Sequence, residues 1–113
     1  MKWERIPTAE ALDAMNEASF QHPVLLFKHS TSCMTSRMAL DRLERDAHRG
    51  ARDEHRYLIN VFGDRPISDA IAERYGVEHE SPQVLVIDKG VCRYTASHIA
   101  IRASEVDEAL KGG

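Results

Sequence analysis

Short apolar runs rich in Val, Ile and Leu alternate along the chain with longer segments whose apolar side chains recur every three or four positions. The short runs predict four strands, at residues 24–30, 57–62, 84–87 and 91–95. An Asp-Lys-Gly turn at 88–90 joins the last two as a hairpin. Residues 24–30 (VLLFKHS) alternate too little to have a wet face, so this run predicts a buried central strand.

The periodic segments predict four amphipathic helices, over residues 8–19, 33–48, 66–75 and 104–111. Thr8 is a suitable N-cap for the first helix, and Pro66 suits the first turn of the third. Gly50, Gly76 and Gly112 follow the last three helices, where glycine commonly ends a helix.

The resulting order, α-β-α-β-α-β-β-α, predicts an α/β protein. Each β-α-β crossover favours a parallel pair of strands, and the closing hairpin adds an antiparallel edge. We therefore expect a mixed four-stranded sheet with helices on both faces. A chain of 113 residues can bury one ordinary core, and no repeat or linker divides it, so residues 1–113 are expected to form a single domain.

Composition and charge exclude several classes of function. The net charge of -3 leaves no basic footprint for nucleic acid. The longest apolar runs, 24–27 and 84–87, are far too short to span a membrane, and the opening MKWERIPTAE lacks the apolar stretch of a signal peptide. We expect a cytoplasmic protein without nucleic-acid or membrane partners, whose two cysteines are free or catalytic thiols. The sequence does not determine its oligomeric state.

The cysteine at position 33 lies where the first buried strand ends and the second helix begins. Ligands gather at the carboxyl ends of parallel strands, and the unpaired N–H groups of a helix start favour a thiolate. The alternative is a buried cysteine that acts as a small hydrophobe, but hydroxyl side chains surround Cys33, which suits a surface turn better. Cys92, by contrast, alternates on a predicted edge strand and is expected to be structural, with a resolving thiol as the lesser alternative.

A second candidate element, Ser81-Pro82, lies immediately before the third predicted strand. Proline lacks the N–H that a sheet needs and therefore belongs at the first residue of a strand, where X-Pro bonds can be cis. We expect a cis bond here, on a loop that faces the Cys33 turn, so that the backbone of Ser81 is free to pair with a thiol ligand.

Other chemistry finds little support in the sequence. Six histidines are present, but no compact Cys/His spacing is typical of a metal site, so no metal is expected. His29 either lies near the thiol and favours the thiolate or faces solvent at the strand end. The sequence has neither a nucleophile elbow nor a phosphate loop.

The strand, the Cys-x-x-Ser helix start, the Ser-Pro before the hairpin and the closing helix together resemble the thioredoxin fold. More narrowly, FKHSTSC followed by Ser36, RPISDAIAERYGVEHESPQV and ASH resemble the monothiol bacilliredoxins of the YtxJ-like family. The resemblance extends from about Val24 to Leu110 and rests on three separated stretches. Two positions depart from that family: Met34-Thr35 replaces a usual Pro-Ile, and Ile99 replaces a usual aromatic residue.

The serine at position 36 occupies the place of a resolving cysteine, so a mixed disulfide on Cys33 must wait for an external thiol. The resemblance implies that the external thiol is bacillithiol or a similar low-molecular-weight thiol, used as a co-substrate with no bound cofactor, and that the protein partners are S-thiolated proteins. It also implies a catalytic pair, Cys33 and Ser36, in which the Ser36 hydroxyl could donate to the thiolate. The expected substrate-binding residues are Thr31, Ser32, Met34, Ser81 and Pro82.

Two other classes of function remain open at this stage. One is a carrier similar to the monothiol glutaredoxins, which would hold an iron–sulfur cluster through Cys33 and an external thiol, although the characteristic Cys-Gly-Phe-Ser is absent. The other is a non-catalytic thioredoxin-fold binding module in which Cys33 is incidental.

Overall fold

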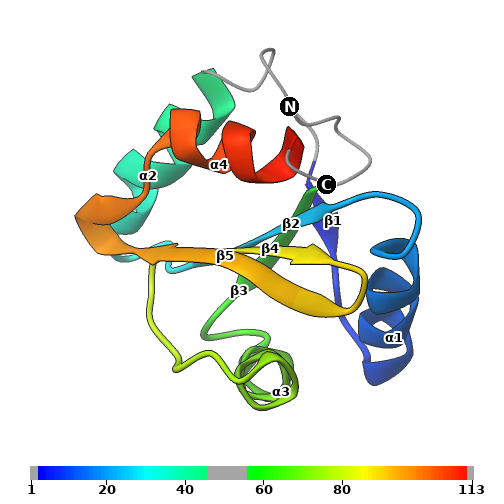
Figure 1. The fold of residues 1–113 in the computed structure, drawn as a ribbon. Helices are drawn as coiled ribbons and strands as arrows, with labels where there is room; N and C mark the ends of the chain where they lie inside the picture. Colours follow the sequence, from blue (N-terminus) through cyan, green and yellow to red (C-terminus); the bar gives the residue numbers. More distant parts are fainter. Residues whose placement is uncertain (1–2, 46–55, 112–113) are drawn as a thin grey trace.

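A five-stranded mixed sheet forms the centre of the protein (Figure 1), in a computed structural model that describes residues 3–45 and 56–111. Its strands are β1 (Glu4–Arg5), β2 (Val24–His29), β3 (Arg56–Asn60), β4 (Gln83–Asp88) and β5 (Val91–Ser97). They lie in the order β1-β3-β2-β4-β5. The first three are parallel to one another, and β4 is antiparallel to both β2 and β5.

The prediction of four strands is wrong by one, because the edge strand β1 was not expected. β1 has only two residues, both exposed, so it carries no alternating pattern. It exists through pairing with β3, in which Glu4 lies opposite Tyr57 and Arg5 opposite Leu58. A strand of this kind is specified by its partner rather than by its own sequence.

Helices cover both faces of the sheet, as predicted. The helices are α1 (Ala9–Ala18), α2 (Met34–Arg45), α3 (Arg65–Tyr75) and α4 (Ala103–Lys111), with a short 3-10 helix, η3 (His98–Ala100), after β5. Helices α2 and α4 lie on one face, and α1 and α3 on the other (Figure 1). None of the helices within residues 3–45 and 56–111 is both long and apolar enough to cross a membrane.

Strand β2 separates two apolar cores, because successive side chains of a strand point to opposite faces. Val24 and Leu26 pack with α1 and α3, whereas Leu25 and Phe27 pack with α2 and α4. All six residues of β2 are buried, which confirms the prediction of a central strand without a wet face.

The predicted ends of the helices are confirmed where the structure describes them. The Thr8 side chain accepts a hydrogen bond from the N–H of Ala11, 3.1 Å away, and caps α1. Gly76 ends α3 in the left-handed conformation, with φ of 64°. Helix α2 is described as far as Arg45, and the predicted extension over 46–48, together with the stops at Gly50 and Gly112, lies outside the described residues.

Candidate active site

The thiol of Cys33 stands at the N-terminus of α2, directly after the loop that leaves β2. The Cys33 carbonyl accepts a hydrogen bond from the N–H of Arg37, 3.0 Å away, which is the first intrahelical bond, so Cys33 occupies the N-cap position. Its own N–H donates to the Ser30 carbonyl at 3.2 Å. Cys33 is a free, partly exposed cysteine, and the N–H groups of the first helical turn are oriented toward its end of the helix.

A cavity of about 250 Å³ adjoins the thiol. It is lined by Ser30, Cys33, Val61, Phe62, Arg65, His79 and Ser81. These residues come from the loop after β2, the loop after β3, the start of α3 and the segment before β4. The topology therefore brings three stretches that are separated in sequence, around residues 30–33, 61–65 and 79–81, to the carboxyl end of β2, where parallel sheets hold their ligands.

The Ser81-Pro82 peptide bond is cis, as predicted, and Ser81 shares the cavity with Cys33. The Ser81 hydroxyl is buried and has no hydrogen-bond partner among the described residues. Buried hydroxyls are nearly always hydrogen-bonded, so the missing partner makes Ser81 a candidate for contact with a ligand. Pro82 does not line the cavity, and its carbonyl accepts from the N–H of His98 at 2.9 Å.

The Ser36 hydroxyl binds the strand rather than the thiol. It accepts a hydrogen bond from the Ser30 N–H at 3.0 Å and lies 2.6 Å from Nδ1 of His29. No hydrogen bond joins it to Cys33 in the part of the chain that the structure describes, so the expected donation to the thiol is not formed. The reason is its direction: Ser36 is completely buried and faces the sheet from the first turn of α2.

The side chain of His29 is buried, so the alternative in which it faces solvent is wrong. Burial lowers the pKa of His29, the positive charge of Arg37 lowers it further, and Glu44 opposes the shift. The imidazole is therefore neutral near pH 7 and contributes no positive charge to the thiol. It reaches the Cys33 turn only through its contact with Ser36.

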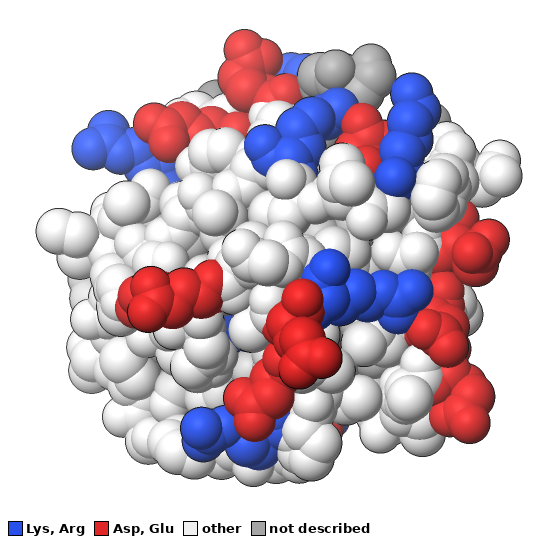
Figure 2. Space-filling view, turned by 60° about the horizontal axis from the view of Figure 1, so that its bottom comes forward, with Lys and Arg blue, Asp and Glu red and all other residues white. Residues whose placement is uncertain are grey.

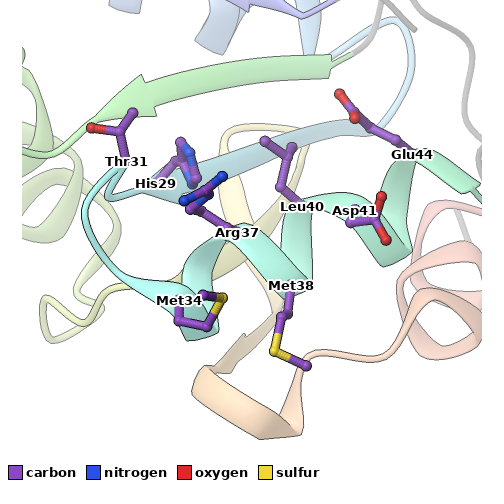
Figure 3. A pocket seen from close by; sticks show the side chains of 8 residues that line it. All are labelled: His29, Thr31, Met34, Arg37, Met38, Leu40, Asp41 and Glu44. Atoms are coloured by element: carbon purple, nitrogen blue, oxygen red, sulfur yellow. The ribbon is translucent and has the colours of Figure 1, made fainter.

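A second, larger cavity of about 690 Å³ lies beside α2 (Figure 3). It is lined by His29, Thr31, Met34, Arg37, Met38, Leu40, Asp41 and Glu44. Two of the predicted substrate-binding residues, Thr31 and Met34, therefore belong to this cavity and not to the one that adjoins Cys33. Ser32 is exposed and lines neither cavity; its hydroxyl lies 3.3 Å from that of Ser30.

Two residues that the sequence analysis passed over, Lys28 and His79, form a polar pair beside the site. Lys28 Nζ donates to the Ser68 carbonyl at 3.0 Å and lies 3.2 Å from Nδ1 of His79, which lines the Cys33 cavity. Burial lowers the pKa of Lys28 to about 8, against the opposing charge of Asp69. The signal was present in the sequence, since a lysine inside a strand with no wet face must be buried and therefore needs partners.

The other cysteine, Cys92, lies on β5 and packs against the core formed by α1 and α3. Its thiol donates to the Tyr94 carbonyl, with 3.3 Å between sulfur and oxygen. Burial raises the pKa of Cys92. Cys92 is paired with Ile87, and Ile87 with Val24, so it is level with the start of β2, whereas Cys33 follows its end.

Charged side chains of both signs are present on the face shown in Figure 2. At the surface, the ion pairs Arg65–Asp69 and Arg74–Asp13 join charges of opposite sign. In residues 3–45 and 56–111, no group of three or more His, Cys, Asp or Glu side chains could hold a metal ion.

Comparison with known proteins places these features in context. The family model described as "Monothiol bacilliredoxin BrxC" matches residues 4–106. A solved structure described as a candidate oxidoreductase with a thioredoxin fold is similar over 94% of this chain and 91% of its own, with 27% identity and a TM-score of 0.82. A Malassezia sympodialis thioredoxin, at 14% identity and a TM-score of 0.75 over 98% of this chain and 90% of its own, shares the fold. The predicted thioredoxin-like fold is thereby confirmed.

Proposed function

Since this chain belongs to the monothiol bacilliredoxin family, whose fold is that of thiol oxidoreductases, we propose that it removes a low-molecular-weight thiol from mixed disulfides on proteins. Bacillithiol is the thiol that the family name suggests. The observation that carries the proposal is the position of Cys33: it is the N-cap of α2, beside a cavity, with a serine where a resolving cysteine would stand.

The reaction consists of two exchanges of sulfur partners. The Cys33 thiolate attacks the bacillithiol sulfur of the mixed disulfide, the S–S bond to the protein breaks, and the protein sulfur leaves as a thiolate that takes up a proton. Cys33 is then joined to bacillithiol by a new S–S bond. A second thiol from solution attacks this bond, forms a disulfide with bacillithiol and leaves Cys33 reduced.

The cavity beside Cys33 suits the thiol-bearing end of a small molecule. Its volume of about 250 Å³ is slightly below the range of about 300–1,000 Å³ that is typical of small-molecule sites, so it can hold only part of such a ligand. The unpartnered Ser81 hydroxyl and the Arg65 guanidinium are polar groups of this cavity that can bind a polar or anionic ligand. We assign Ser81 to ligand binding through its hydroxyl, whereas the sequence analysis expected its backbone to pair with the ligand.

Exposed apolar side chains beside the thiol suit a protein substrate. Met34 follows Cys33 and is 66% exposed, and Phe62, which lines the Cys33 cavity, is 69% exposed. Large apolar side chains at the surface around a reactive group commonly contact a partner. The proposed partners are therefore S-thiolated proteins, which contact these apolar side chains beside the Cys33 cavity, and a small thiol that enters this cavity. Such exchange requires a reducing compartment, which agrees with the expected cytoplasmic location.

Intact mass spectrometry tests the proposal. Purified protein is incubated with bacillithiol disulfide, and separately with glutathione disulfide, beside the variants Cys33→Ser and Cys92→Ser. We expect one adduct per chain in wild type and Cys92→Ser, reversed by excess reductant, and none in Cys33→Ser. If wild type forms no adduct, the proposal is wrong. Iron and colour that depend on Cys33 would then favour a cluster carrier, and their absence a binding module.

A further inference from the structure

The most unusual charged group near the site is Lys28, which is completely buried within the central strand β2. Lysine is almost never buried without partners, since removing an ammonium from water is costly. Here Nζ donates to the Ser68 carbonyl and lies 3.2 Å from His79 Nδ1. The reaction proposed above does not use Lys28.

The contact with Lys28 determines which nitrogen of His79 carries the proton. A lysine ammonium only donates hydrogen bonds, so Nδ1 of His79 accepts, and the proton of the neutral ring is on Nε2. The Ser68 hydroxyl, 3.2 Å from Nδ1, is placed on the same side of the ring. The edge that bears Nε2 is thus directed away from Lys28, and His79 lines the cavity that Cys33 also lines.

We infer that Lys28 and His79 form a proton relay that delivers a proton to the sulfur displaced when Cys33 attacks a mixed disulfide. The inference rests on the proposed function. An alkyl thiol leaves a disulfide more easily when a proton reaches it as the S–S bond breaks, because its thiolate is a basic leaving group. His79 contacts the cavity, and Lys28 acts through His79.

Each proton that the relay moves has a donor and an acceptor. The displaced sulfur takes the proton from Nε2 of His79, Nδ1 takes a proton from the Lys28 ammonium, and Lys28 becomes a neutral amine. The net change is the transfer of one proton from Lys28 to the leaving thiolate. Water then returns a proton to Lys28 through His79 before the next turnover, and His79 ends with its proton on Nε2 again.

The charged groups around the pair support this role. The pKa of Lys28, lowered to about 8 by burial against the opposing charge of Asp69, lies near the value of about 8.5 for an ordinary thiol, so the transfer costs little. The pKa of His79 is lowered by burial and by Lys28 and Arg65, whereas Asp69 and Glu80 oppose the shift. His79 is therefore neutral near pH 7 and can pass a proton in either direction.

The test compares two disulfides that differ in their leaving groups. Reaction of Cys33 with 5,5′-dithiobis(2-nitrobenzoate) releases an aryl thiolate of low basicity, which needs no proton, whereas 2-hydroxyethyl disulfide releases a basic alkyl thiolate. At pH 7 we expect Lys28→Met and His79→Asn to slow the alkyl reaction by about tenfold or more and to change the aryl reaction by less than about twofold. Asparagine keeps an amide to contact Lys28, so His79→Asn tests the relay with little change in packing.

The pH profile gives a second readout. In wild type, the ratio of the alkyl rate to the aryl rate should fall as pH rises through about 8, where Lys28 loses its proton, and this fall should vanish in both variants. Lys89→Met and His22→Gln, which change the same residue types far from the cavity, are the controls and should behave as wild type. Equal slowing of both disulfides, or no selective slowing, would overturn the relay. A wild-type protein inert to both disulfides would instead overturn the proposed function and the relay together.

Discussion

The two cysteines of this protein lie toward opposite ends of the sheet, Cys33 just after β2 and Cys92 within β5, and have different surroundings. Cys33 follows the carboxyl end of β2, at a helix N-terminus and beside a cavity. Cys92 is level with the amino end of β2, inside a strand, with its thiol donating to a carbonyl. The comparison shows that the backbone offers the two sulfurs opposite partners, N–H groups at a helix N-terminus for Cys33 and a carbonyl acceptor for Cys92.

The separation of the two thiols also decides whether one can resolve the other. Strand β2 has six residues, and five steps along a strand span about 17 Å. Disulfides require Cα atoms within about 7 Å of each other. Cys92 therefore cannot form a bond with Cys33 in the folded protein, and an adduct on Cys33 must be released by an external thiol.

Removing each thiol in turn gives the largest expected contrast. Cys33→Ser should lower the rate of thiol exchange by about 1000-fold or more, because it removes the nucleophile, whereas Cys92→Ser should keep the rate within about twofold. The measurement is release of a small thiol from a mixed disulfide on a protein. An internal disulfide found in the wild type by peptide mapping would contradict the separation argued above.

A second thiol introduced at position 36 should shorten the lifetime of a mixed disulfide between Cys33 and a small thiol. In Ser36→Cys, an internal thiol three residues from Cys33 should release a bound small thiol about 100-fold faster than in wild type, because the attack becomes intramolecular. Ser36→Ala is the matched control, since it also loses the bonds to Ser30 and His29 but gains no thiol. Time-resolved intact mass gives the rates. Equal lifetimes in all three proteins would show that position 36 cannot reach Cys33.

Alkylation rates compare the two thiols directly in the wild type. Near pH 7 we expect iodoacetamide to modify Cys33 at least about tenfold faster than Cys92, since burial raises the pKa of Cys92 and its sulfur is bonded to a carbonyl. The rate at Cys92 should increase as pH rises toward its raised pKa. Peptide mapping after a short pulse measures both sites. Faster alkylation of Cys92 than of Cys33 would contradict the view that Cys33 is the reactive thiol.

The smallest expected effect is a loss of stability in acid, caused by the buried side chain of His29 at the end of β2. The pKa of His29 is lowered in the folded protein, so below its ordinary value of 6.5 the unfolded chain binds a proton that the folded chain does not. His29 should therefore contribute a fall in the free energy of unfolding of at most about 1 kcal/mol between pH 6.5 and 5.5, because it accounts for one proton. His79, whose pKa is also lowered, adds a separate contribution. Urea unfolding at pH 7.5 and 5.5 measures the change. His29→Gln should reduce it, and a dependence unchanged in that variant would contradict the assignment.

Local patterns in the sequence determined much of the structure. The apolar run of β2, the Thr8 cap, the Gly76 helix end, the cis Ser81-Pro82 bond and the helix that starts at Cys33 were all predicted. Each of these features depends mainly on a few neighbouring residues, so a short stretch of sequence is enough to predict it. The strand β1 was missed because its two exposed residues show no apolar alternation, and it forms only by pairing with β3.

The sequence by itself determined that a cysteine stands at a strand-to-helix junction with a serine three residues later, because backbone propensities and caps act locally. Only the tertiary structure decided what surrounds that cysteine. It turned Ser36 toward His29, divided the predicted binding residues between two cavities, and paired Lys28 with a histidine 51 residues away. The physical reason is that a buried polar group must find its partner wherever the packing of the sheet and helices brings one, and this packing depends on the whole chain.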